Sequence, residues 1–278
     1  METNAKIPLE SSVSAVGGRS FYARVSALGF GLIALAGVVV LVLGLTSGNG
    51  GDSGGGAVFG LVFVAVGLLV AGLVWRFGRW ALILAAVLAL ALLGLVGPFS
   101  LFSLGHPESA RDFIPIMLAL AGALLGLVGS VVAIVQWRRG TARASGTRTE
   151  RLALGVTLGA VAGAVVLSTI LTLVGNPAVS AEARASATSM VIRNFTYTPI
   201  LMQVKSGETV RLVLKNDDPT LHTFTLPRAG VDVSVPPGGE RIVEFKAPSS
   251  GEYQWYCIPH SDGSGGTRSG MVGILQTQ

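Results

Sequence analysis

The stretch Tyr256-Cys257-Ile258-Pro259-His260, followed after a Gly- and Ser-rich segment by Gly270-Met271-Val272-Gly273, decides how the C-terminal part of this chain is read. Cys257 is the only cysteine, so it cannot form a disulfide within the chain. His222 belongs to the same part of the chain and is expected to come from a separate strand. A thiolate, two imidazoles and a weak axial thioether form the ligand set of a trigonal copper site. These residue types therefore predict a metal site made of His222, Cys257, His260 and Met271.

The residues before Cys257 predict a strand that ends at this site. Side chains alternate between the two faces of a strand, so Tyr253, Trp255 and Cys257 point the same way, towards a core. Gly270 and Gly273 flank Met271 and would allow the backbone to bend so that the Met271 sulfur points back to the site.

Short β-type runs separated by turn signals predict seven or eight strands over about 90 residues, a pattern typical of a two-sheet sandwich. The segment from about Met190 to Gln278 shares a set of residues with a known family: Pro199, Val204, Gly207 to Val210, Asn216, Asp217, His222, Phe224, Pro237-Gly238, Phe245 to Pro248, Gly251-Glu252-Tyr253, Tyr256-Cys257, Pro259-His260 and Gly270 to Gly273. Through these residues the segment resembles a cupredoxin, nearest to the plastocyanin type.

The resemblance implies one type 1 copper ion that cycles between Cu(I) and Cu(II), with His222, Cys257, His260 and Met271 as its ligands. The chain departs from the family in its last loop, where ten residues, 261–270, separate His260 from Met271, against four in plastocyanin-type sequences. Two arrangements stay open: Met271 is the axial ligand, or the site is three-coordinate.

The composition is that of a membrane protein. Half of the 278 residues are hydrophobic and only 13% are charged. The net charge of +5 arises before residue 189, with 12 Lys and Arg against 7 Asp and Glu, while the remainder carries 8 of each. Because no folded part has a strongly basic composition, nucleic-acid binding is not expected.

Five apolar segments each have the length that crosses a bilayer as a helix, about 20 residues. They are Val25 to Leu45, Ala57 to Trp75, Ala81 to Phe102, Phe113 to Gln136 and Leu152 to Val174. The expected fold class is therefore a multi-domain chain: an all-α transmembrane bundle of five helices, then an all-β Greek-key sandwich. The expected divisions are an N-terminal cytoplasmic tail (1–24), the bundle (25–174), a flexible small-residue linker (175–188) and the copper domain (189–278).

The distribution of basic residues predicts the orientation. Lys and Arg gather before the first span, in the second loop and in the fourth loop, which by the positive-inside rule are cytoplasmic. The C-terminal copper domain is then periplasmic or extracellular, on a multi-pass protein of the cell membrane. Trp75, Trp80 and Trp137 fall at the predicted cytoplasmic boundary, as interfacial anchors do.

The spans contain no Asp, Glu, Lys, Arg or His, the groups that ion and proton pathways normally need. The membrane part is therefore interpreted as an anchor or an assembly surface rather than a transporter. Two sets of glycines predict close helix packing: Gly122 and Gly126 in the fourth span, and Gly155, Gly159 and Gly163 in the fifth. His106 is interpreted as an ordinary loop residue.

The sequence is compatible with three functions. The first is a membrane-anchored blue-copper electron carrier on the outer face of the membrane, not itself an enzyme, that serves redox protein partners or is a subunit of a respiratory or photosynthetic complex. It contacts lipid and has no small-molecule substrate. The second is a membrane-bound copper module for storage, delivery or sensing. The third, a copper oxidase or nitrite reductase, needs further copper sites, for which only His106 is left.

Overall fold

The computed structural model describes residues 20–46, 53–175, 179–262 and 268–278. The described residues fall into two compact units, one holding most of the five long helices and the other holding the strands, and each is considered by itself. Most of the predicted N-terminal tail, part of the predicted linker and half of the long loop after His260 lie outside the described residues.

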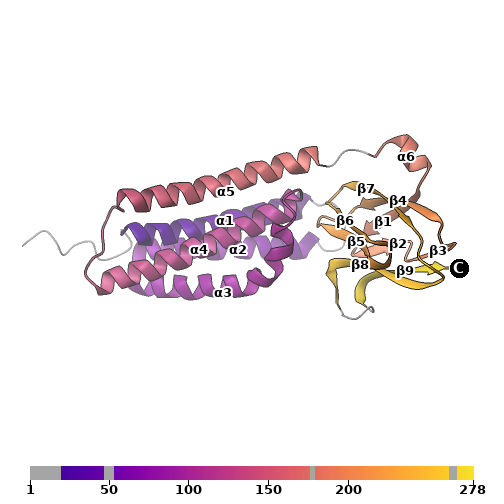
Figure 1. Ribbon diagram of the computed structural model, residues 1–278. Helices are drawn as coiled ribbons and strands as arrows, with labels where there is room; N and C mark the ends of the chain where they lie inside the picture. The colour runs from indigo at the N-terminus through magenta and orange to yellow at the C-terminus, as the bar shows by residue number, and fades with distance from the viewer. Residues whose placement is uncertain (1–19, 47–52, 176–178, 263–267) are drawn as a thin grey trace, which may run out of the picture. The chain divides into compact units, whose positions relative to one another are not determined.

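The five predicted spans are confirmed as five helices that are long and apolar enough to cross a membrane (Figure 1). Each helix contains one predicted span and extends one to four residues beyond it at every end but the last, where α5 ends at the predicted residue. The helices are α1 (Phe21–Thr46), α2 (Ser53–Phe77), α3 (Arg79–Leu104), α4 (Ala110–Arg138) and α5 (Arg148–Val174).

Glycine brings α1 into backbone contact with α4. A Cβ added at Gly122 would lie 2.5 Å from the carbonyl oxygen of Gly29, and one added at Gly29 would lie 2.4 Å from the backbone nitrogen of Gly126. A buried hydrogen bond of 2.8 Å between the hydroxyls of Ser26 and Ser130 joins the same two helices. The close packing expected at Gly122 and Gly126 is therefore present, and it has the small-residue character of membrane helix interfaces.

The close packing predicted for the three glycines of α5 is not present among the described residues. A Cβ added at Gly155, Gly159 or Gly163 would meet nothing within 4 Å. These three glycines bring no backbone of the described residues close to α5, because α5 turns this face away from its neighbours.

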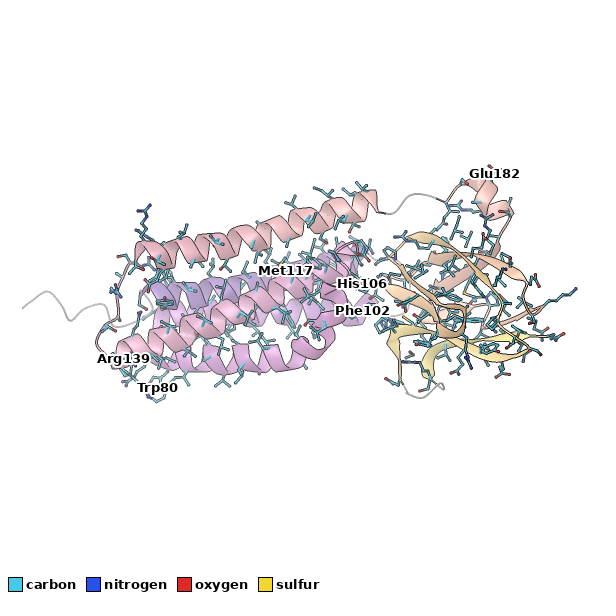
Figure 2. All side chains as sticks on the ribbon, viewed as in Figure 1. Trp80, Phe102, His106, Met117, Arg139 and Glu182 are labelled. Carbon is cyan, nitrogen blue, oxygen red and sulfur yellow. The ribbon has the colours of Figure 1, made fainter. Side chains whose placement is uncertain are left out.

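One end of the helical unit carries the predicted aromatic anchors. The guanidinium of Arg79 lies over the rings of both Trp80 and Trp137, at 5.5 and 5.3 Å from the ring centroids. Trp80 and Arg139 lie at this same end (Figure 2). The two tryptophans and the arginines thus share one boundary of the helical unit, the pattern expected at a membrane interface.

The C-terminal unit is a β-sandwich of two mixed sheets. One sheet has the strand order β2-β1-β4-β7 and the other β3-β9-β8-β5-β6, and the pairs β1·β4 and β3·β9 are parallel. The strands are β1 (Thr188–Arg193), β2 (Thr196–Thr198), β3 (Leu201–Val204), β4 (Thr209–Asn216), β5 (His222–Leu226), β6 (Val231–Val235), β7 (Glu240–Lys246), β8 (Gly251–Asp262) and β9 (Ser269–Thr277).

The core between the sheets is built around Trp255. Its ring centroid lies 6.2 Å from that of Tyr197 and 5.7 Å from that of Phe224. A Cβ at Gly273 would lie 2.3 Å from the Trp255 ring, so glycine is needed there for the ring to lie against β9. Cys257 belongs to this same buried cluster, as the alternation along the strand predicts, and Met271 belongs to it as well.

A short helix, α6 (Ala181–Ala185), lies inside the segment expected to be a flexible linker. The Ser180 hydroxyl accepts a hydrogen bond from the backbone N–H of Ala183 and caps the helix. A serine N-cap ahead of Ala-rich sequence favours such a turn of helix.

Candidate metal centre

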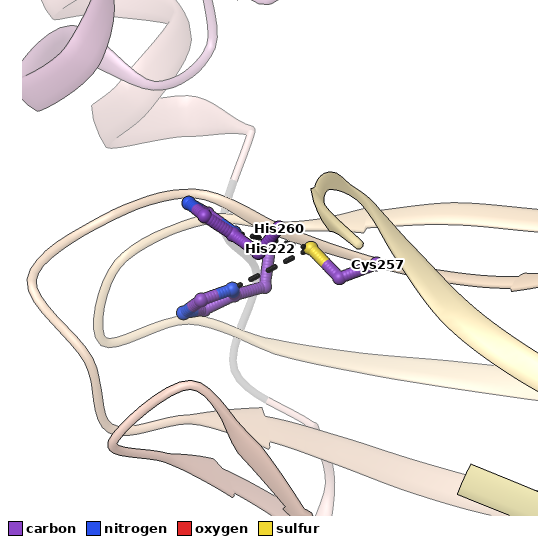
Figure 3. A group of neighbouring side chains, drawn as sticks. All are labelled: His222, Cys257 and His260. Carbon is purple, nitrogen blue, oxygen red and sulfur yellow. Dashed lines mark hydrogen bonds between the residues drawn. The ribbon is translucent and has the colours of Figure 1, made fainter. Parts of the chain in front are cut away.

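Three of the four predicted ligands meet at one end of the sandwich. One ligand atom from each of His222, Cys257 and His260 lies within 4.8 Å of the others (Figure 3). The Cys257 Sγ is 3.6 Å from Nδ1 of His222 and 3.3 Å from Nδ1 of His260. Both imidazoles therefore present the same ring nitrogen to the sulfur.

Two neighbouring strands supply these side chains. His222 is the first residue of β5, and β5 pairs with β8, which carries Cys257 and His260. The pairing of β8 with β9 shifts between Tyr256 and Ser261, so the residues between them leave the regular ladder. This irregularity turns Cys257 and His260 towards one point, which the alternating faces of a regular strand would not do for residues three apart.

Met271 lies opposite this irregularity. Tyr256 pairs with Val272 and Ser261 pairs with Gly270, so Met271 faces the four residues 257–260. It is buried, with 2% of its surface exposed, in the cluster that contains Cys257. The pairing of Ser261 with Gly270 and of Asp262 with Ser269 also shows how the long loop begins and ends: β8 and β9 continue as a hairpin past the site. The position of Met271 is thus compatible with an axial role, which stays a prediction.

Thr223 links the strand of one ligand to the strand of another. Its backbone N–H donates to the Cys257 sulfur at 3.3 Å, and its hydroxyl accepts from the backbone N–H of Ile258 at 2.8 Å. The Tyr197 hydroxyl donates to the Thr223 carbonyl at 2.5 Å. Thr223 therefore joins β5 to β8 and fixes the sulfur relative to β5.

Burial sets the protonation of all three groups in the metal-free protein. It lowers the pKa of His222, although the nearby Asp218 carboxylate opposes this, and together with the proximity of His222 it lowers the pKa of His260 to about 4. Burial also raises the pKa of the Cys257 thiol. Neutral imidazoles have a lone pair for a metal ion, and a buried thiol that resists ionisation in the free protein loses its proton when a cation binds.

The donor set fits copper. Thiolate and imidazole together select soft or borderline ions, and a site with two imidazoles and one thiolate is the trigonal arrangement of blue-copper proteins. Zinc, the other common ion for such donors, prefers four ligands in a tetrahedron in structural sites. His222, Cys257 and His260 would hold the ion.

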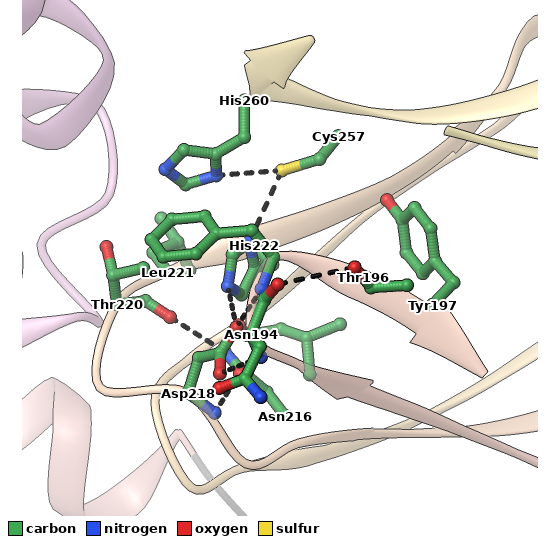
Figure 4. Close-up of polar contacts among 12 residues, drawn as sticks. Asn194, Thr196, Tyr197, Asn216, Asp218, Thr220, Leu221, His222, Cys257 and His260 are labelled. Carbon is green, nitrogen blue, oxygen red and sulfur yellow. Dashed lines mark hydrogen bonds and ion pairs between the residues drawn. The ribbon is translucent and has the colours of Figure 1, made fainter. Parts of the chain in front are cut away.

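Two residues near the site were not anticipated from the sequence. The Asp218 carboxylate lies 2.9 Å from Nε2 of His222 (Figure 4). The Phe195 ring packs edge to face on both His222 and His260, with centroid distances of 5.4 and 4.9 Å. An acidic residue four positions before a predicted ligand histidine was the available signal for Asp218. No feature of the sequence indicated a role for Phe195.

His106 lies apart from this centre in the chain, at the end of α3. Its Nδ1 hydrogen-bonds the carbonyl of Phe102 at 2.8 Å and its ring packs on the Phe102 ring. Both residues are labelled in Figure 2. It behaves as a local helix-end residue, in line with its interpretation as an ordinary loop histidine.

Residues 163–267 match the family model described as a cupredoxin-like domain. The copper-resistant cuproprotein CopI of Pseudomonas aeruginosa is 42% identical over 57 residues, which are 20% of this chain and 31% of that protein. The match therefore spans under a third of the length of this curated relative.

Among solved structures, auracyanin A, a blue copper protein of Chloroflexus aurantiacus, is 16% identical, with a TM-score of 0.27 over 33% of this chain and 98% of that one. A chain of a heme-copper terminal oxidase dimer is also 16% identical, with a TM-score of 0.29 over 47% of this chain and 100% of that one.

Proposed function

Because the C-terminal part of this chain contains a cupredoxin-like domain, we propose that the protein is a membrane-anchored electron carrier with one type 1 copper ion. The observation that carries the proposal is the Cys257 sulfur, which lies within 3.3 and 3.6 Å of two imidazole Nδ1 atoms in a buried site. A copper ion bound there supplies one-electron chemistry between Cu(I) and Cu(II). His222, Cys257 and His260 would be the equatorial ligands and Met271 the axial ligand.

The surrounding residues suit transfer of an electron better than transformation of a substrate. Hydrogen bonds from Thr223 hold the sulfur and the β8 backbone in place, and the strands that carry the ligands are paired. A site that cannot move much keeps the same geometry in both oxidation states, so little reorganisation accompanies each transfer. His260 is only half-buried and would give the electron its route to a partner.

The helices supply the location. We place the C-terminal domain on the outer side of the membrane, since the basic loops favour the cytoplasm. An anchored carrier meets membrane oxidoreductases at a high effective concentration without strong charge steering, and the domain from residue 189 onward has balanced charge. Redox proteins or a membrane complex are the proposed partners.

The experiment is a Cu(II) titration of the full chain in detergent micelles, followed by visible absorption and electron paramagnetic resonance. An intense thiolate-to-copper band with narrow hyperfine splitting is expected, and Cys257→Ser should remove both. Met271→Leu conserves volume, so a change of the spectrum would assign the axial ligand, while Met202→Leu in β3 is the matched control. A colourless complex or an ordinary tetragonal spectrum would overturn the proposal.

A second candidate, copper handling, is favoured by the identity with the copper-resistant protein CopI. It predicts that Cu(I) leaves readily to a competing chelator, whereas an electron carrier retains copper in both oxidation states. The rate of Cu(I) loss to such a chelator, compared between the full chain before and after a cycle of oxidation and reduction, separates the two.

A further inference from the structure

Asp218 is a buried carboxylate beside the site, with 6% of its surface exposed. It lies in the turn between β4 and β5. Its neighbour Asp217 forms ion pairs with Arg193 at 2.7 Å and with Lys215 at 2.9 Å. The described partners of Asp218 are instead backbone N–H groups and the imidazole of His222 (Figure 4).

The contact with His222 defines which ring nitrogen carries hydrogen. An ionised carboxylate only accepts hydrogen bonds, so Nε2 of His222, 2.9 Å from Oδ2 of Asp218, must donate. A neutral imidazole has one N–H, which leaves Nδ1 with its lone pair directed at the Cys257 side, 3.6 Å from the sulfur. Asp218 therefore favours the tautomer of His222 that can bind a metal through Nδ1.

The same carboxylate holds the turn that carries Phe195. Oδ1 accepts the backbone N–H of Asn194 at 2.6 Å and Oδ2 accepts that of Phe195 at 2.9 Å. Both turn residues have positive φ, 52° and 56°, a conformation that is uncommon for residues other than glycine and needs support from its surroundings. The Phe195 ring that results lies against His222 and His260.

Asp218 is itself held by Asn216. The Asn216 carboxamide oxygen accepts the backbone N–H of Asp218 at 2.9 Å, and its amide group donates to the carbonyls of Thr220 and Val235 at 2.8 Å each. These hydrogen bonds of Asn216 hold the turn between β4 and β5, and so they fix the position of the Asp218 carboxylate relative to His222.

From these contacts we infer that Asp218 is a positioning residue of the metal site: it fixes the tautomer and orientation of His222, seats Phe195 over both imidazoles, and favours Cu(II) over Cu(I). The last part rests on the function proposed above. A negative charge on the outer nitrogen of a ligand histidine raises the basicity of that ligand, which stabilises the more highly charged oxidation state of the ion.

The first test needs no copper. The chain has three histidines, so selective ¹⁵N-histidine labelling of the full chain in micelles gives a readable spectrum, assigned with His106→Gln and His260→Gln. His222 is expected as the Nε2–H tautomer in the wild-type protein, and Asp218→Asn should convert it to a mixture. A wild-type His222 with its hydrogen on Nδ1, or an unchanged tautomer in Asp218→Asn, would overturn the inference. This arm decides the role of Asp218 even if the copper titration refutes the proposed function.

The second test uses the copper-loaded chain. Outer partners of ligand histidines typically change metal affinity by about 10–100-fold. Asp218→Asn is expected to lower the affinity for Cu(II) relative to Cu(I) by about 10-fold, which raises the reduction potential by about 59 mV. Asp217→Asn removes the same charge one residue away, at a residue that does not contact His222. It should change the affinity for Cu(II) relative to Cu(I) by less than about threefold. Equal shifts in the two variants would mean that Asp218 acts only through distant charge and would overturn the positioning role.

Discussion

The two parts of this chain are built with opposite placements of large apolar side chains. In the helices the buried residues are mostly small, such as Ala85, Ala89 and Ala123, and leucines such as Leu90 point outwards with 62% of their surface exposed. In the β domain the largest side chains, Trp255, Tyr197 and Phe224, are the buried ones. The first arrangement suits a lipid exterior, where close backbone packing holds helices together, and the second suits water.

The largest effect is expected when a tryptophan is replaced by alanine in each of the two parts. Trp255→Ala should lower the free energy of unfolding of the β domain by about 3–5 kcal/mol, because a fully buried ring is lost from the core. Trp80→Ala removes a ring that is 70% exposed and should cost less than about 0.5 kcal/mol. Denaturant unfolding of the full chain in micelles, followed by circular dichroism and hydrogen exchange, measures both. Similar losses in the two variants would refute the contrast.

A lysine placed on the outer surface of each part tests whether that surface faces lipid or water. Leu90→Lys, near the middle of α3, should raise the free energy of membrane insertion by about 2.5–3.5 kcal/mol, since lysine would face hydrocarbon. Ile242→Lys on β7, where the side chain is 38% exposed, should change stability by no more than about 0.5 kcal/mol. A membrane-insertion assay measures the first change and denaturant unfolding measures the second; an unaffected Leu90→Lys would argue that α3 does not span.

A single methyl group tests the packing inside the helical part. Gly122→Ala puts a Cβ 2.5 Å from the Gly29 carbonyl oxygen, so α1 and α4 must separate, at a cost of about 1–3 kcal/mol. Gly159→Ala meets nothing within 4 Å and should be neutral or stabilising by up to about 1 kcal/mol through helix propensity. Thermal unfolding of the two variants in one detergent measures the difference; if Gly159→Ala is the more damaging, another surface packs on α5.

The smallest expected effect is a pH dependence confined to the β domain. In the metal-free protein the pKa of His260 is lowered from 6.5 to about 4, so between these values the unfolded chain binds more protons than the folded one. Stability is therefore complete above about pH 6.5 and falls as the pH is lowered to about 4. Because His260 is half-buried, solvent reduces the size of the effect. His260→Gln should flatten the unfolding profile in this range, and an unchanged slope would assign the dependence to other groups.

The sequence was informative where the signal is local. Each span is one uninterrupted apolar run, and the ligand residues are rare types at a spacing that few other structures need. This is why α1 to α5 and the meeting of His222, Cys257 and His260 could be anticipated.

The parts that escaped prediction depend on contacts between distant residues. The left-handed turn at Asn194 and Phe195 is supported by Asp218, more than twenty residues further on. No propensity of Asn194 or Phe195 alone indicates that the ring will cover two imidazoles. Likewise, the continuation of β8 and β9 beyond the metal site follows from strand pairing rather than from the Gly- and Ser-rich composition of the loop.

Because β8 and β9 stay paired past the metal site, the length of the loop after His260 does not determine the position of Met271. The pairs Ser261·Gly270 and Asp262·Ser269 act as rungs above the site. Residues inserted between Asp262 and Ser269 leave these pairs as they are, whereas one residue inserted between Gly270 and Met271 would shift the pairing by one and invert the faces of the residues that follow. The number of residues between Asp262 and Ser269 can therefore differ without altering the ligands, so a peptide label inserted there is expected to leave the metal site intact.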